Sequence, residues 1–337
     1  SIERNMPWQA GGKLILYTDT PPLWLNWDHP RIRVVLHTEV YPVDEQAKVL
    51  PTFNSDSILS TMGNIPGLAT YFVKFDDDNI VGRMTTREDF VTEAGQPMLY
   101  FERHLFRGDP SGKDDEERVA QLKRSGQTWL GKMYHTRLWF TRKMPHFQSE
   151  EALAKVPADL FRFSKHAPVV IKTAMLQDVY SRWRDEFTRA RQDVFRTTYG
   201  LDVHALWNWY CRLTPMDDGS GRPSCTTWEQ GKMDRDARLV ILSTKDTNTQ
   251  LRCMFNLGKI LADPPIFFTL NDGLGKDNGA ELADFAYRTL LPAFFPVRSE
   301  FETNDLPPYV YRVMDVAKAK GRPIDNKPKT TTTPGKK

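Results

Sequence analysis

Short runs of apolar and β-branched residues recur in the early part of the chain, separated by polar and turn-forming residues. They occupy residues 13–17, 32–36, 70–75 and 97–102. Runs of this length and composition are typical of buried strands in an α/β sheet. Two similar runs follow much later, at 237–243 and 266–270. Because strands from both ends of the chain then enter one sheet, the pattern predicts a single continuous α/β domain.

The middle of the chain has helical periodicity instead. It predicts helices over about 116–140 and 172–196. Asp202 is expected to cap a further helix, whose large side chains we assign to the core rather than to a ligand platform: Leu206, Trp207, Trp209 and Tyr210. We interpret these helices as an insertion over about 116–213 within a domain that spans 1–316. The last two predictions are a loop at 214–236 and a helix at 280–291.

The composition is that of a folded protein, with 40% hydrophobic and 26% charged residues, which argues against a disordered chain. No apolar run is long enough to predict a transmembrane segment. The charge is uneven, since residues 317–337 contain seven Lys or Arg and one acid. This basic tail could contact RNA, anionic lipid or an acidic protein partner, or could simply be solvated.

Cysteine usage bears on the compartment. The three cysteines, Cys211, Cys225 and Cys253, cannot all pair within the chain and have no C-x-x-C spacing. We therefore expect core thiols in a reducing compartment, and neither a disulfide framework nor a zinc site.

Three consecutive acids are the sharpest local signal. Asp76, Asp77 and Asp78 directly follow the predicted strand at 70–75, and Asp272 follows the one at 266–270. The carboxyl ends of strands meet at the crevice where α/β proteins bind ligands, and acids there can hold a divalent cation against a diphosphate. An ordinary acidic turn is the alternative interpretation.

Other polar residues could support such a site. His166 is expected to begin a helical stretch, where it could act on a proton or a phosphate or be structural. Thr52, Asn54 and Ser55 lie in a turn, where they could donate hydrogen bonds to phosphate or sugar hydroxyls or cap the next helix.

Taken in order, these segments resemble the Stealth family of sugar-phosphate transferases. The resemblance rests on LILYTD, LPTFNS, IPGLATYFVKFDDDNIVGR, HTRLWF, KHAPVVIKTAMLQDVYSRWRDEF and FFTLNDGL. It implies a glycosyltransferase-like Rossmannoid sheet that binds a nucleotide sugar with Mg²⁺ or Mn²⁺. Such an enzyme transfers sugar 1-phosphate to an acceptor hydroxyl. The family's acids and histidine match Asp77, Asp78, His166, Asn271 and Asp272, which are implied to hold metal and donor and to carry catalysis.

Several positions depart from the family pattern. An opening strand is absent, Leu59 replaces a Glu, Asp76 replaces an Asn, and Thr198 stands where an Arg is expected. Because lost charge compensation at a transfer site costs several kcal/mol each time, we predict a decayed catalytic centre without cofactors. The main hypothesis is therefore a pseudoenzyme that serves as a structural subunit of a large complex, with protein subunits as partners. The alternative is an active, metal-dependent sugar-1-phosphate transferase.

The location is predicted from weaker signals. The chain opens at Ser1 without an apolar leader, its pI is about 8.6, and it contains no N-x-S/T sequon. These features favour an organelle, with the mitochondrion as the first expectation and the lumen of the secretory pathway as the alternative.

Overall fold

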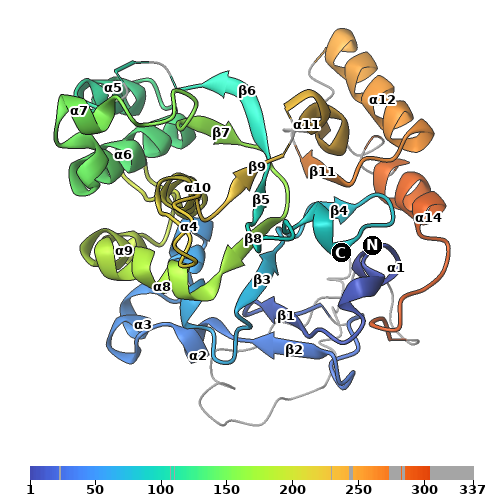
Figure 1. The fold of residues 1–337 in the computed structure, drawn as a ribbon. Helices are drawn as coiled ribbons and strands as arrows, with labels where there is room; N and C mark the ends of the chain where they lie inside the picture. The colour runs from blue at the N-terminus through green and yellow to red at the C-terminus, as the bar shows by residue number, and fades with distance from the viewer. Residues whose placement is uncertain are drawn as a thin grey trace, which may run out of the picture.

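Strands run through the centre of the molecule, with helices on either side (Figure 1). The computed structural model describes residues 1–303 except 23, 107, 110, 229, 243–245, 273–281 and 283–284. The strands are β1 (Leu14–Tyr17), β2 (Ile32–Val35), β3 (Tyr71–Lys74), β4 (Asn79–Val81), β5 (Met98–Leu99), β6 (Phe101–Leu105), β7 (Arg162–Ser164), β8 (Val169–Lys172), β9 (Thr226–Thr227), β10 (Ala237–Leu242) and β11 (Phe267–Asp272). All six strand predictions are confirmed, although the run at 97–102 divides into β5 and β6.

The strands pair in small ladders. β1 and β2 are parallel, as are β5 and β9, whereas β3 with β8 and β6 with β7 are antiparallel. β11 lies between parallel β10 and antiparallel β4. The β4 and β11 pair joins the early and late parts of the chain in one sheet. This confirms the α/β class and the expectation that both ends contribute strands.

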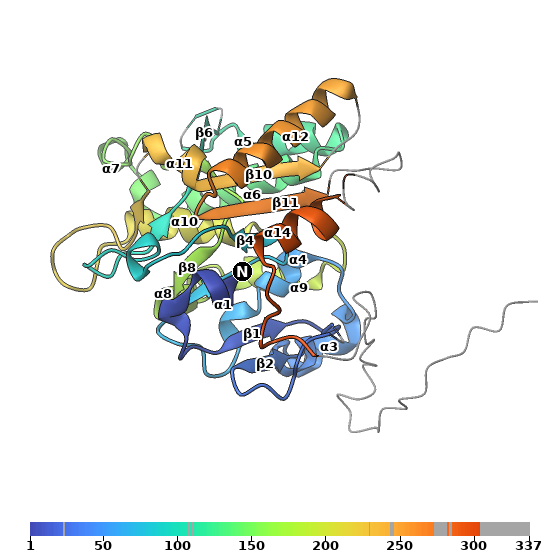
Figure 2. The same cartoon turned by 90° about the vertical axis from the view of Figure 1, so that its right-hand side faces the viewer.

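The helices are α1 (Ile2–Asn5), α2 (His37–Val40), α3 (Val43–Val49), α4 (Ser55–Leu59), α5 (Asp115–Arg124), α6 (Thr128–Lys143), α7 (Glu150–Leu153), α8 (Thr173–Arg182), α9 (Arg184–Gln192), α10 (Val203–Leu213), α11 (Gln230–Asp236), α12 (Thr247–Ala262) and α14 (Leu291–Phe294). Single turns of 3₁₀-helix are η1 (Pro7–Gln9), η2 (Met62–Asn64), η3 (Arg87–Asp89) and η4 (Pro145–Phe147), and η5 (Phe285–Leu290) is a π-helix. Figure 2 shows α12 and β10 on the opposite side of the molecule from β1 and β2.

Two predicted helices are interrupted for local reasons. The stretch at 116–140 breaks at Gly126, whose φ of 71° is left-handed and ends α5 before α6 begins. The stretch at 172–196 breaks at Trp183, which separates α8 from α9. The loop prediction for 214–236 is wrong in part, because this segment contains β9 and α11. The region 116–213 also contributes β7 and β8, so it is not purely helical.

Helix α10 fills the core as predicted. Its Leu206, Trp207, Trp209 and Tyr210 side chains are all buried. At its start the Asp202 carboxylate accepts a hydrogen bond of 2.9 Å from the Ala205 N–H, so Asp202 is the expected N-cap.

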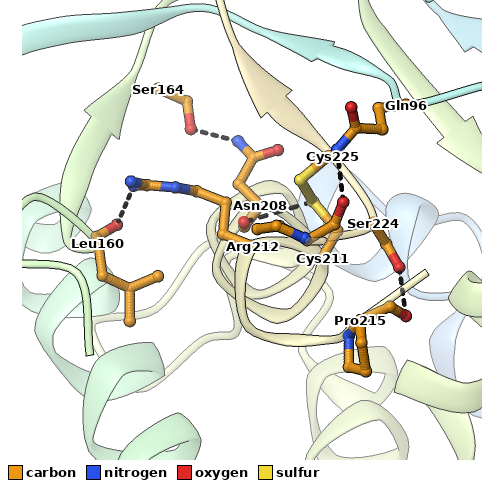
Figure 3. Close-up of a disulfide and its surroundings, with 10 residues drawn as sticks. Gln96, Leu160, Ser164, Asn208, Cys211, Arg212, Pro215, Ser224 and Cys225 are labelled. Carbon is orange, nitrogen blue, oxygen red and sulfur yellow. Dashed lines mark hydrogen bonds between the residues drawn. A yellow bond between two sulfur atoms is a disulfide. The ribbon is translucent and has the colours of Figure 1, made fainter. Parts of the chain in front are cut away.

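A disulfide between Cys211 and Cys225 joins the end of α10 to the segment that precedes β9 (Figure 3). The prediction of unpaired thiols is therefore wrong for these two residues. The bond closes a loop of sequence separation 14, which Ser224 reinforces by donating from its hydroxyl to the Pro215 carbonyl at 2.9 Å. Spacing alone could not identify the pair, because their proximity depends on the packing of β9 beside β5. Cys253 is buried in α12.

None of the helices in the described residues is both long and apolar enough to cross a bilayer. The basic segment 317–337 lies outside the described residues, so its predicted contacts stay predictions. The division into a domain at 1–316 and a tail also stays a prediction.

Candidate functional site

A cavity of about 2710 Å³ lies against the inner strands. Every residue of β1 and of β3 lines it, and so does the turn that follows β3. Among the described strands β1 pairs only with β2, and β3 only with β8, so each has an edge free to face this space. The sequence-predicted residues Ser55, Asp77, Asp78, His166 and Asn271 all line this one cavity.

The three acids after β3 divide into two groups. The chain makes a turn here, in which the Asn79 N–H donates to the Asp76 carbonyl at 3.1 Å. The turn leaves Asp77 exposed and brings the carboxylates of Asp76 and Asp78 together with the His166 imidazole. Ligand atoms of these three residues all lie within 4.8 Å of one another. Asp76, which the sequence identified both as one of three strand-end acids and as a departure from the family pattern, is therefore part of the cluster.

His166 occupies the link between β7 and β8, not the start of a helix, so that part of its prediction is wrong. Its Nε2 lies 3.3 Å from Asp76 Oδ2 and 3.5 Å from Asp78 Oδ1. Its backbone carbonyl accepts a hydrogen bond of 2.7 Å from the Thr269 hydroxyl, which in turn accepts one of 3.0 Å from Asn79 Nδ2. Thr269 and Asn79 are buried, and they fix His166 against β11 and β4.

The electrostatics of the three groups differ. Burial would raise the pKa of Asp76, but the hydrogen bond from His166 and the charge of Lys74 outweigh it and hold that pKa well below its ordinary range. Burial, with the neighbouring charges of Asp76 and Asp77, instead raises the pKa of Asp78. The hydrogen bond to Asp76 raises the pKa of His166. Asp76 is thus a strongly acidic carboxylate that is hydrogen-bonded to His166, beside a less acidic Asp78.

A second charged cluster lies further into the cavity and was not foreseen. Lys132 of α6 lies 2.7 Å from Asp56 Oδ1 and 3.4 Å from Asp202 Oδ2, and its side chain is only 9% exposed. His204 lines the same wall, where burial and the charge of Lys74 lower its pKa to about 4. The sequence identified Asp202 as a helix cap only, because its partners lie far away along the chain.

The structure shows where Thr198 and Leu59, two of the residues that depart from the family pattern, lie relative to the cavity. Thr198 is buried, but Arg196, two positions earlier, lines the cavity and donates to the Ser55 hydroxyl at 2.9 Å. Leu59 lines the cavity and packs on the main core. The Arg expected at position 198 is absent, but three other cations, Lys74, Lys132 and Arg196, line the cavity.

Thr52 and Asn54 do not line the cavity. The Asn54 carboxamide oxygen accepts a hydrogen bond of 3.1 Å from the Asp56 N–H at the start of α4, and its nitrogen donates to the Asp193 carbonyl at 2.9 Å. The Thr52 hydroxyl accepts from the Asn54 N–H at 3.2 Å. The structure thus supports the capping alternative for this turn, with Ser55 alone facing the cavity.

Asn271 and Asp272, which the family resemblance also implicates, lie at the end of β11. Asn271 lines the cavity, and the neighbouring Leu270 N–H donates to the Asp78 carbonyl at 3.4 Å. The backbone of Asp272 ends β11, whereas its side chain lies outside the described part of the structure.

The chemistry of this donor set fits a hard divalent cation. Carboxylate oxygens gathered with one imidazole suit Mg²⁺ and, because of the nitrogen, Mn²⁺ even better. The cluster lines a cavity large enough for a nucleotide sugar, and cations that also line this cavity could meet its phosphates.

Comparison with known proteins finds polysaccharide phosphotransferases. The family profile described as "Stealth protein CR2, conserved region 2" matches residues 1–99. An exopolysaccharide phosphotransferase of Streptomyces coelicolor is 28% identical over 90% of this chain and 44% of its own length. The capsular polysaccharide phosphotransferase SacB of Neisseria meningitidis serogroup A is 24% identical over 88% of this chain and 48% of its own.

A shorter match has a higher identity. An exopolysaccharide phosphotransferase of Lactiplantibacillus plantarum is 37% identical over 29% of this chain and 27% of its own length. The chain thus spans less than half the length of these relatives. The matching profile covers the segment that contains the three acids, and two of the relatives extend the similarity across His166 and β11. Residues 1–99 thus match the Stealth CR2 region, and the wider chain is similar to polysaccharide phosphotransferases.

Proposed function

We propose that this chain contains the catalytic centre of a metal-dependent transferase that moves sugar 1-phosphate from a nucleotide-sugar donor to an acceptor hydroxyl. The observation that carries the proposal is the convergence of Asp76, Asp78 and His166 within 4.8 Å in one cavity. The relatives' names as polysaccharide phosphotransferases support the reaction class. This is the alternative that the sequence left open, and the intact charge pairs favour it over a pseudoenzyme.

The reaction needs a base for the acceptor and positive charge for the diphosphate. The acceptor oxygen attacks the phosphorus that carries the sugar, the bond from that phosphorus to the nucleoside monophosphate breaks, and a phosphodiester forms. His166 Nε2 donates to Asp76 Oδ2, 3.3 Å away, so the other ring nitrogen, Nδ1, takes the proton of the acceptor hydroxyl and Asp76 stabilises the imidazolium that results. A divalent cation, when bound, would neutralise diphosphate charge, with Asp78 to hold it and Asp77 and Asp272 as further acids implied by the family resemblance.

Cations of the chain itself would support the leaving group. Arg196 lies beside Ser55 on the cavity wall, and its guanidinium can donate two parallel hydrogen bonds to a phosphate. Lys132 is held between two carboxylates and keeps its proton, since these charges raise its pKa despite burial. Fixed positive groups that need no reorganisation are the main source of stabilisation for a developing phosphate charge.

The test is release of nucleoside monophosphate from a panel of nucleotide sugars with Mn²⁺ or Mg²⁺. We expect Asp78→Asn and His166→Ala each to reduce turnover by roughly 100-fold or more, as is usual when a group acting in the transition state is removed. Asp217→Asn is the matched control, because Asp217 is 86% exposed and pairs with Lys172 outside the cavity. Turnover that survives both cavity variants unchanged would refute the proposal.

A further inference from the structure

Lys74 is a buried cation that contacts the acid cluster through Asp76. It is the last residue of β3, its side chain is 7% exposed, and its ammonium contacts Asp76 Oδ1. Burying a lysine is costly unless a carboxylate compensates its charge, and burial indeed lowers the pKa of Lys74. The other acids close enough to influence it are Asp202 and Asp78, with smaller effects than Asp76.

The two oxygens of Asp76 have separate partners. Oδ1 accepts from Lys74, whereas Oδ2 lies 3.3 Å from His166 Nε2. The backbone N–H of Asp76 donates to Asn79 Oδ1 at 3.0 Å, which fixes the start of the turn. Asp76 is thus held from three sides.

Asp78 is bound more loosely. Its Oδ1 lies 3.5 Å from both His166 Nε2 and Asn79 Nδ2, at the limit of a hydrogen bond. A metal cation that bound to Asp78 would displace only its weak contacts with His166 and Asn79. A cation that bound to Asp76 would have to displace Lys74 and His166.

We propose that Lys74 is an internal counter-ion that makes Asp76 a positioning residue for His166 instead of a third metal-binding acid. This inference rests on the proposed function, and it explains how an acid replaces the family's Asn without adding net charge at the diphosphate. Lys74 neutralises the Asp76 carboxylate, which is then free to orient the His166 imidazole. Asp78 supplies the negative charge that would bind a divalent cation.

The pairing is tested by a double-mutant cycle on the full chain without metal: Lys74→Met, Asp76→Asn and the double variant, measured by urea unfolding. Removing one member of a buried ion pair leaves the other charge unpaired, so each single variant should raise the unfolding equilibrium constant by roughly 100-fold. The double variant leaves no unpaired charge and should lie within about fivefold of the wild type. Lys172→Met and Asp217→Asn form the control cycle, since Asp217 is 86% exposed and its pair with Lys172 should show little coupling.

The positioning role is tested by Mn²⁺ affinity, followed by electron paramagnetic resonance without donor. Lys74→Met removes a cation and frees Asp76, so Mn²⁺ should bind about tenfold more tightly. Asp76→Asn leaves the Lys74 charge uncompensated and should weaken binding by about tenfold, and the double variant should restore it to within about threefold. A pair with a purely structural role would leave Mn²⁺ affinity unchanged in folded variants.

The outcomes separate the two proposals. Additive effects in the unfolding cycle, or Mn²⁺ affinity that is the same in all folded variants, would overturn the role of Lys74. Wild-type protein that binds no Mn²⁺ would count against the proposed function, and the unfolding cycle would then decide the inference on the pair alone.

Discussion

Several charged side chains in the cavity are paired with an opposite charge or with a hydrogen-bonded partner. Lys74 contacts Asp76, Lys132 contacts Asp56 and Asp202, and Arg196 contacts Ser55. Such pairs keep cations charged and in place when water leaves the cavity. A phosphate that enters therefore meets positive groups whose orientation is already set, so little ordering is required when it binds.

Arg196 is the cation whose contribution to donor binding can be isolated most simply. Its partner Ser55 is neutral, so Arg196→Gln leaves no buried charge behind. We expect the KM for the nucleotide sugar to rise by about tenfold, because a charged hydrogen bond to phosphate is worth roughly 1.5–3 kcal/mol. Steady-state kinetics of monophosphate release measures this. Arg222→Gln, in an exposed pair with Asp218, should leave KM unchanged, and an equal effect of both variants would exclude a specific role.

Asp19 illustrates a residue that serves stability instead of chemistry. Its carboxylate accepts from the His37 N–H at 2.7 Å and lies 2.9 Å from His37 Nδ1. Burial opposes this charge, but the contacts with His37 prevail and lower the pKa of Asp19. Because the folded pKa is depressed, the stabilisation is complete above the unfolded value near 4 and is lost as the pH falls through the folded value.

Asp19→Asn should therefore destabilise the protein at pH 7 by about 2 kcal/mol, and the difference from wild type should shrink towards zero near pH 2. Urea unfolding across this pH range measures it. Asp217→Asn, at an exposed position, should show a small effect throughout. A deficit for Asp19→Asn that is constant with pH would mean that the carboxylate charge is not the stabilising feature.

The sequence predicted part of this site and could not predict the rest. Asp78 and His166 were identified because each stands in a local motif beside a strand. Lys74 and Lys132 carry no such signal, since lysines in a strand or helix usually lie on the surface. Their burial depends on acids that folding brings to them, and Lys132 meets Asp56 from 76 positions away.

At the scale of elements, the disulfide between Cys211 and Cys225 holds part of the segment 214–236, which the sequence pattern predicted to be a loop. Cys211 belongs to the buried face of α10, and Cys225 precedes β9. Short apolar strands and long amphipathic helices were predictable from periodicity. The two-residue strand β9 was not, because it exists only through its register with β5.

Loss of this disulfide should lower stability measurably. A closed loop of about 15 residues contributes about 3 kcal/mol by the chain-entropy argument, so the Cys211→Ser, Cys225→Ser double variant should melt several degrees lower. Dithiothreitol should have the same effect on the wild type and none on the variant. Equal melting temperatures of oxidised and reduced wild type would show that the bond adds nothing to the fold.

The Cys211–Cys225 disulfide also gives an argument about the cellular compartment of the protein. Disulfides persist in oxidising surroundings, so we infer that the secretory lumen is a better expectation than the mitochondrion. Alkylation of the protein in intact cells, followed by mass spectrometry, should find Cys211 and Cys225 protected until reduction. Free thiols at both positions would return the expectation to a reducing compartment.

At the scale of the whole molecule, the cavity is lined by β1 and β3, and each of them pairs on one side only among the strands that the structure describes. In β1 the Leu14 and Thr18 N–H groups bond to the neighbouring β2 segment, so the alternating Ile15 and Tyr17 groups point to the other edge. That edge lines the cavity, as β3 does. A strand that paired with this edge of β1 would bond to the Ile15 and Tyr17 N–H groups.

Amide hydrogen exchange can test this organisation. The central residues of β11 pair with β10 on one side and β4 on the other, and should be protected by roughly 100-fold more than Ile15 and Tyr17. Exchange followed residue by residue by nuclear magnetic resonance gives the comparison within one sample. Leu14 and Thr18 are internal controls, since they lie in or beside the same strand but their N–H groups donate to the β2 segment. If Ile15 and Tyr17 exchange as slowly as these controls, another segment already pairs with β1, and the cavity is closed along that edge. If they exchange fast, the edge is open, and any strand that completes the sheet must slow these two amides when it binds.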